Sequence, residues 1–113
     1  MHEYSIVQAL LDQCETYAKE NNAEKITKVV TKIGKFSGVE PHLLEIAFDT
    51  FKEKSICDGA EFVMNIQELV LYCNECKKET QRSEAHYQCE HCGSTNVSVV
   101  DGDDMYLMTL EME

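Results

Sequence analysis

Two pairs of cysteines, each pair separated by two residues, constrain this chain more than any other feature. Cys73 and Cys76 form the first pair, Cys89 and Cys92 form the second, and twelve residues lie between the pairs. A two-residue gap lets a tight backbone turn present two thiolates to one ion, and two such turns complete a tetrahedron of sulfur. The segment 73–96 is polar and too short to build a core, so a metal must hold it together. We therefore predict a structural zinc in a closed four-sulfur site.

Other interpretations of this segment remain open. Tetrahedral sulfur also suits iron, so a rubredoxin-like electron carrier is one alternative. A zinc-ribbon adapter for proteins or nucleic acid is another. Two separate redox motifs fit poorly, because neither pair precedes a helix in a thioredoxin-like pattern. His86 and His91 lie inside the segment, either as exposed and inert side chains or as accessory zinc ligands that would make the site respond to pH.

The charge of the chain excludes several partners. Ten Lys and Arg oppose 21 Asp and Glu, which gives a formal net charge of −11. Such a surface repels phosphate backbones and anionic membranes, so we expect no nucleic-acid partner and no membrane partner. No apolar run is long enough to span a bilayer, and the first twenty residues lack the pattern of a secretory signal. We therefore expect a cytoplasmic protein, in which cysteines serve as metal ligands or core residues rather than disulfides.

Hydrophobic periodicity predicts an α+β fold. Helical spacing over 3–21, with Cys14 in the apolar stripe, predicts a first helix, and Pro41 opens a second. Alternation predicts strands over 25–33 and 60–67, and a terminal hairpin of 97–100 with 105–112 around Asp101-Gly102. We expect two helices packed on a small sheet of about three strands, with an inserted zinc-ribbon module held by four cysteines. The predicted domains are 1–72 plus 97–113, and 73–96. His42 and Cys57 are expected to be ordinary exposed residues.

Several motifs together resemble those of one family. The chain starts MHEYSIVQALL, contains a strand ending IG, continues through CNEC and CEHC, and ends DDMYLMTLEME. Over essentially its whole length it resembles the HypA family of nickel metallochaperones for nickel–iron hydrogenase maturation. The resemblance implies a protein that is not an enzyme and that carries Ni(II) beside a structural zinc. It also implies a HypB-type accessory GTPase and the hydrogenase large-subunit precursor as partners, with urease maturation proteins in some organisms.

The resemblance places the nickel site at Met1, His2 and Glu3, within the 1–72 plus 97–113 domain. The terminal amine, the His2 amide nitrogen and the His2 imidazole can reach one ion through small chelate rings, and such ligands favour square-planar nickel over tetrahedral zinc. The amide nitrogen or the carboxylate of Glu3 is the nearest fourth ligand. Gly93 stands where some family members carry a histidine. Monomer and domain-swapped homodimer both remain open.

Overall fold

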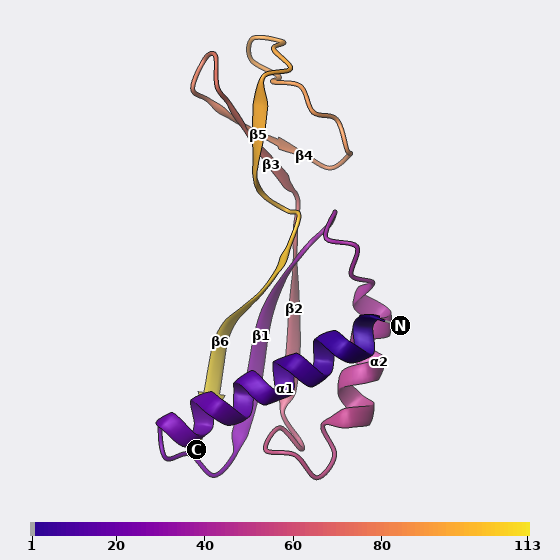
Figure 1. Ribbon diagram of the computed structural model, residues 1–113, viewed down its shortest axis with the longest axis vertical. Coiled ribbons are helices and arrows are strands. Elements are labelled where there is room, and N and C mark those ends of the chain that lie inside the picture. The colour runs from indigo at the N-terminus through magenta and orange to yellow at the C-terminus, as the bar shows by residue number, and fades with distance from the viewer. Residues whose placement is uncertain (1) are drawn as a thin grey trace. The chain divides into compact units, whose positions relative to one another are not determined.

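The computed structural model describes residues 2–113 and contains two helices and two small three-stranded sheets (Figure 1). Strand order is β2-β1-β6 in the first sheet and β4-β3-β5 in the second. The predicted combination of two helices, a three-stranded sheet and an inserted cysteine module is therefore confirmed. In chain order the elements are α1 (His2–Glu20), β1 (Ile26–Gly34), α2 (Pro41–Phe51), β2 (Glu61–Gln67), β3 (Leu69–Cys73), β4 (Glu79–Arg82), β5 (Val97–Asp101) and β6 (Met105–Met112).

The chain divides into two compact units. The first, unit 1, holds residues up to 32, 40–65 and 106–113, and the second, unit 2, holds 33–39 and 66–105. The functional division predicted from sequence, 1–72 plus 97–113 against 73–96, stays a prediction. In the described part of the chain, no helix is both long and apolar enough to cross a membrane.

The core of unit 1 is built from one face of each helix and one face of the first sheet. Helix α1 buries residues at helical spacing, as its sequence predicts, and β1 buries alternate residues such as Val29 and Thr31. The rings of Phe48 on α2 and Phe62 on β2 stack with centroids 4.2 Å apart. Tyr17 of α1 is 45% exposed, which leaves an aromatic ring on the surface.

Cys57 is not the exposed residue that the sequence predicts. It is completely buried, and its thiol is hydrogen-bonded to that of Cys14, which is also completely buried in α1. The hydrogen bond and burial together raise the pKa of Cys14 well above its usual range. The misprediction arose because the turn after α2 packs onto α1, a contact between distant parts of the sequence that local pattern does not reveal.

The predicted terminal hairpin is wrong in its pairing. Both strands exist, but β5 pairs with β3 in the second sheet and β6 lies beside β1 in the first. Residues 102–104, which connect β5 to β6, therefore carry the chain from one sheet to the other and do not form a tight hairpin turn. A strand pattern shows which face of a strand is apolar, but it does not identify the partner strand.

Backbone packs directly on backbone where β1 ends in unit 2. A Cβ atom on Gly34 would lie 2.4 Å from the carbonyl carbon and oxygen of Gly102. A Cβ on Gly102 would in turn lie 2.4 Å from the Glu68 carbonyl oxygen and 2.6 Å from the Leu69 Cα. Hydrogen bonds hold this stack, from the Gly34 N–H to the Asp104 carbonyl at 2.8 Å and from the Phe36 N–H to the Gly102 carbonyl at 2.9 Å. Only glycine fits at positions 34 and 102.

Candidate metal centres

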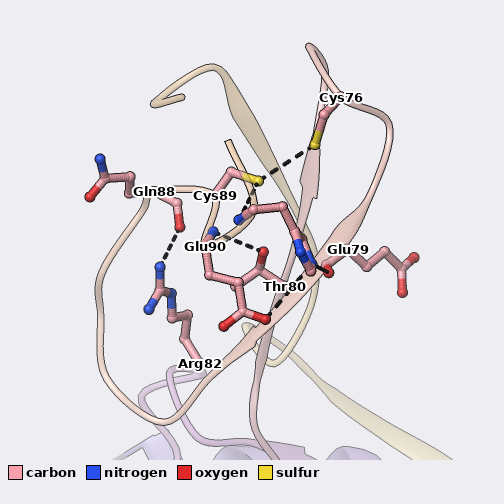
Figure 2. A network of polar contacts seen from close by, with 8 residues as sticks. Cys76, Glu79, Thr80, Arg82, Gln88, Cys89 and Glu90 are labelled. Carbon is pink, nitrogen blue, oxygen red and sulfur yellow. Dashed lines mark hydrogen bonds and ion pairs between the residues drawn. The ribbon is translucent and has the colours of Figure 1, made fainter. Parts of the chain in front are cut away.

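Unit 2 brings the four predicted cysteines into one cluster. The Sγ atoms of Cys73, Cys76, Cys89 and Cys92 all lie within 4.8 Å of one another. Two of the sulfur pairs are closer. Cys73 and Cys92 are 3.5 Å apart, and Cys76 and Cys89, which Figure 2 shows, are 3.6 Å apart. Zinc–sulfur bonds of about 2.3 Å in a tetrahedron require sulfurs roughly 3.8 Å apart. The donor set therefore fits a four-thiolate zinc.

The two cysteine turns have the same backbone design. Each is closed by an N–H four residues after its first cysteine, from Lys77 to the Cys73 carbonyl and from Gly93 to the Cys89 carbonyl, both at 3.0 Å. Each is closed again by the N–H of the first cysteine, which donates to the carbonyl five residues on, at 2.9 Å in both turns. The closing residue has positive φ in each turn, 64° at Lys77 and 76° at Gly93. Glycine adopts this conformation without strain at position 93, and Lys77 adopts the same conformation against its steric preference.

Backbone amides prepare this cluster for a cation. The Cys76 N–H lowers the pKa of the Cys73 thiol, and the Cys92 N–H contributes most to lowering the pKa of Cys89 to about 6. The Ser94 N–H acts in the same direction on Cys92, but contact with the Cys73 thiol raises the pKa of Cys92 to about 12 overall. The shifts therefore favour the thiolate forms of Cys73 and Cys89, while the raised pKa values of Cys76 and Cys92 favour their protonated forms. A divalent cation would replace those protons.

Polar contacts hold the second cysteine turn against strand β4 (Figure 2). The buried Thr80 hydroxyl accepts a hydrogen bond from the Glu90 N–H at 3.3 Å. The Arg82 guanidinium donates to the Gln88 carbonyl at 2.8 Å, and the Gln88 amide donates to the Gly93 carbonyl at 2.8 Å. The bonds of Thr80 and Arg82 join β4 to the second turn, and the bond of Gln88 braces the turn itself, so together they orient the turn on β4.

The two histidines of the segment lie outside the cysteine cluster. The His86 ring contacts the Gln88 side-chain oxygen at 3.0 Å, and the His91 ring contacts the Glu79 carbonyl at 3.2 Å. Only the backbone of His91 reaches the cluster, where its N–H donates to the Cys89 sulfur at 3.3 Å. An accessory role for either imidazole stays a prediction.

Two of the three predicted nickel residues, His2 and Glu3, lie at the start of α1. Met1 is outside the described residues, and His2 is the first residue of the helix. Glu3 is 5% exposed, and its carboxylate accepts a hydrogen bond at 3.4 Å from the N–H of Glu40. Glu40 caps α2, where its own carboxylate accepts from the His42 N–H at 3.1 Å. The beginnings of the two helices are thereby joined within unit 1.

Glu40 is the residue that sequence reasoning missed. Because Pro41 is the first residue of α2, the sequence alone marks Glu40 as the residue that caps this helix. Its contact with Glu3 spans 37 positions of sequence, and no periodicity in the sequence indicates it.

Comparison with known proteins identifies the family. A family model described as HypA, hydrogenase/urease nickel incorporation, metallochaperone, matches residues 1–112. The hydrogenase maturation factor HypA of Aquifex aeolicus (strain VF5) is 52% identical over 113 residues, which cover 100% of this chain and 98% of that protein. HypA of Shewanella halifaxensis (strain HAW-EB4) is 54% identical over 113 residues, with coverage of 100% and 98%.

Solved structures agree with the sequence relatives. The solution structure of the Ni metallochaperone HypA from Helicobacter pylori matches with a TM-score of 0.75 and 38% identity, over 99% of this chain and 97% of that chain. A second structure, titled solution structure of HypA protein, matches with a TM-score of 0.79 and 39% identity, over 100% and 97%. This chain therefore belongs to the HypA family of hydrogenase and urease nickel-incorporation metallochaperones.

Proposed function

We propose that this protein binds Ni(II) at Met1, His2 and Glu3 and delivers it to the nickel–iron hydrogenase large-subunit precursor. The observation that carries the proposal is the sequence Met1-His2-Glu3, whose His2 and Glu3 open α1, in a chain of the HypA family. A HypB-type accessory GTPase is the proposed partner in transfer, and urease maturation proteins are a second proposed client. The protein acts in the cytoplasm as a carrier and not as an enzyme.

The start of α1 suits a nickel ion that must be handed on. The first N–H groups of a helix have no partner within it, so deprotonating an amide near residue 2 or 3 breaks no helical hydrogen bond. A terminal amine, deprotonated amide and imidazole produce the strong planar field that Ni(II) prefers. An ion held at the end of a chain stays open on one side, which allows a client to replace its ligands.

The environment of Glu3 supports its amide nitrogen, rather than its carboxylate, as the fourth ligand. The carboxylate is nearly buried and accepts the hydrogen bond from the Glu40 N–H. Turning it toward an ion at the terminus would give up that bond and leave the Glu40 N–H without its acceptor, at a cost of about 1–3 kcal/mol. The backbone nitrogen of Glu3 is already in the first helical turn and needs no such rearrangement.

The proposed zinc fixes the shape of the cysteine module. Bound by Cys73, Cys76, Cys89 and Cys92, it would supply cross-linking and no catalytic chemistry, because four thiolates leave no open coordination position. The module then presents a rigid surface to a partner, while the nickel site lies in the other unit of the chain.

A nickel titration of tagless, zinc-loaded protein tests the proposal. We expect one Ni(II) per chain with a square-planar absorbance spectrum in the parent protein. His2→Ala, and a version with one glycine before Met1, should both lose this binding. His86→Ala removes a different exposed imidazole and should bind nickel like the parent. If all four proteins bind alike, the N-terminus is not the nickel site.

A substitution at Glu3 separates its two ligand atoms. Glu3→Gln keeps the amide nitrogen and an oxygen that can accept from Glu40, so we expect nickel affinity within about threefold of the parent, or ~0.7 kcal/mol. A large loss of affinity, with the helical circular dichroism of the parent retained, would assign the fourth position to the carboxylate.

A further inference from the structure

Strand β6 is an open edge of the first sheet. It pairs with β1 on one side, and in the described part of the chain no strand lies on its other side. The Glu113 N–H donates to the Lys25 carbonyl at 2.8 Å and the Lys25 N–H donates to the Glu113 carbonyl at 3.3 Å, which sets the register. In an antiparallel pair, only every second residue directs its backbone N–H and carbonyl groups toward the partner strand. The backbone groups of the residues between them face away from β1, toward the open side of β6. These are Tyr106, Met108, Leu110 and Met112.

A groove follows this edge. It has a volume of about 220 Å³ and is lined by Tyr17 and Asn21 of α1 together with residues 107–110 and 112 of β6. Successive residues of one strand point to opposite faces of a sheet, so a groove that is lined by the consecutive residues 107–110 of β6 must run along its edge. Met108 is 55% exposed and Tyr17 is 45% exposed, so apolar side chains flank the outward backbone groups.

The edge lacks the usual protection against pairing. Proteins commonly guard an edge strand with prolines, charges, bulges or short length. Strand β6 is eight residues long, contains no proline and carries one charge, Glu111. The Glu111 carboxylate lies 3.8 Å from the Lys28 ammonium of neighbouring β1. This charge is therefore paired across the sheet and does not guard the open edge.

Acidic side chains border the groove. Asp12 and Glu20 line a second depression on α1, and Tyr17 belongs to both hollows. The whole chain has a net charge of −11, so a second copy of the chain would meet its own charge at this edge. An extended segment with basic side chains is the complementary occupant.

We propose that the β6 edge is a docking site at which an extended, basic and apolar segment of a partner protein adds a fourth strand to the β2-β1-β6 sheet. Main-chain hydrogen bonds to the four outward residues supply affinity, Tyr17 and Met108 contact apolar side chains, and Asp12 and Glu20 select lysine or arginine. The proposal does not depend on nickel binding at the N-terminus.

Hydrogen exchange with a defined peptide tests it. The probe is a blocked ten-residue peptide that alternates valine and lysine, added to the zinc-loaded full chain. In the free chain, the amides of Tyr106, Met108, Leu110 and Met112 should exchange quickly while those of the intervening residues are protected. The peptide should slow all four outward amides. Protection at any other surface instead, or none at all, overturns the proposal.

Control peptides separate strand pairing from charge attraction. The same sequence N-methylated at alternate residues keeps its charge but loses one row of N–H donors, so its affinity should fall at least about tenfold. A peptide that alternates valine and glutamate should not bind. Equal binding of the methylated peptide would show attraction by charge alone and would refute strand addition.

Matched variants locate the site on the chain. Met108→Lys places a charge on the edge strand and should weaken binding of the valine–lysine peptide at least about tenfold. Ile46→Lys makes the same change at a residue of α2 that is 44% exposed and should leave binding unchanged. Equal effects would overturn the proposal, and so would a free chain that sediments as a dimer with its outward β6 amides already protected.

Discussion

Replacing Gly34 by alanine should destabilise the protein far more than its position at the end of a strand suggests. The new Cβ would lie 2.4 Å from two backbone atoms of Gly102, where ordinary contact begins at 3.4 Å. Gly102 cannot withdraw, because it is itself closely packed on Glu68 and Leu69. An added group in a well-packed site commonly lowers the free energy of unfolding by about 1–3 kcal/mol. Here the clashing atoms belong to backbone, which cannot move aside as a side chain can, so we expect a loss of about 3 kcal/mol or more.

Gly38→Ala is the matched control for this experiment. Gly38 has a φ of +81° and nothing within 4 Å of an added Cβ, so its substitution tests conformational strain without a clash. That strain should cost about 1–2 kcal/mol. Urea denaturation of the zinc-loaded proteins, followed by circular dichroism, measures both free energies of unfolding. If Gly34→Ala costs no more than Gly38→Ala, the backbone contact with Gly102 does not restrict position 34 as we infer.

Three further predictions concern the cysteine module. Lys77→Gly should leave stability unchanged or raise it by up to about 1 kcal/mol, while Gly93→Ala lowers it by about 1–2 kcal/mol, because both closing residues have positive φ; a loss of stability in Lys77→Gly, or a gain in Gly93→Ala, in urea denaturation would contradict the shared turn design. Thr80→Val should cost about 1–3 kcal/mol, since it leaves the Glu90 N–H without its acceptor; Thr80→Ser, which keeps the hydroxyl, is the control, and equal losses would assign the effect to packing. Removing the metal with a strong chelator should abolish the amide dispersion of residues 73–96 in NMR spectra and leave the helical circular dichroism of α1 and α2 intact; a dispersed module in the metal-free protein would show that zinc is not what holds it.

The cysteine site was predictable because its chemistry is local. A two-residue spacing within each pair is enough to bring two thiolates to one ion, and Gly93 provides the positive φ that ends the turn. The polar bonds that orient the module were not predictable, because Thr80 meets Glu90 only once β4 and the second turn are folded together. The same distinction applies to the N-terminus, where Met1-His2-Glu3 is visible as a motif while the contact of Glu3 with Glu40 is not.

The sequence by itself determined where the two helices and most of the strands lie, which faces of them are apolar, and which four cysteines come together in one cluster. These properties follow from local periodicity and ligand spacing, which a single stretch of chain contains. Only the tertiary structure decided that β5 and β6 belong to different sheets, that Cys57 is buried against Cys14, and that Gly34 must be a glycine. Each of these depends on which distant segments come into contact. Whether a residue is buried depends on what packs against it, and a local stretch of sequence does not contain that information.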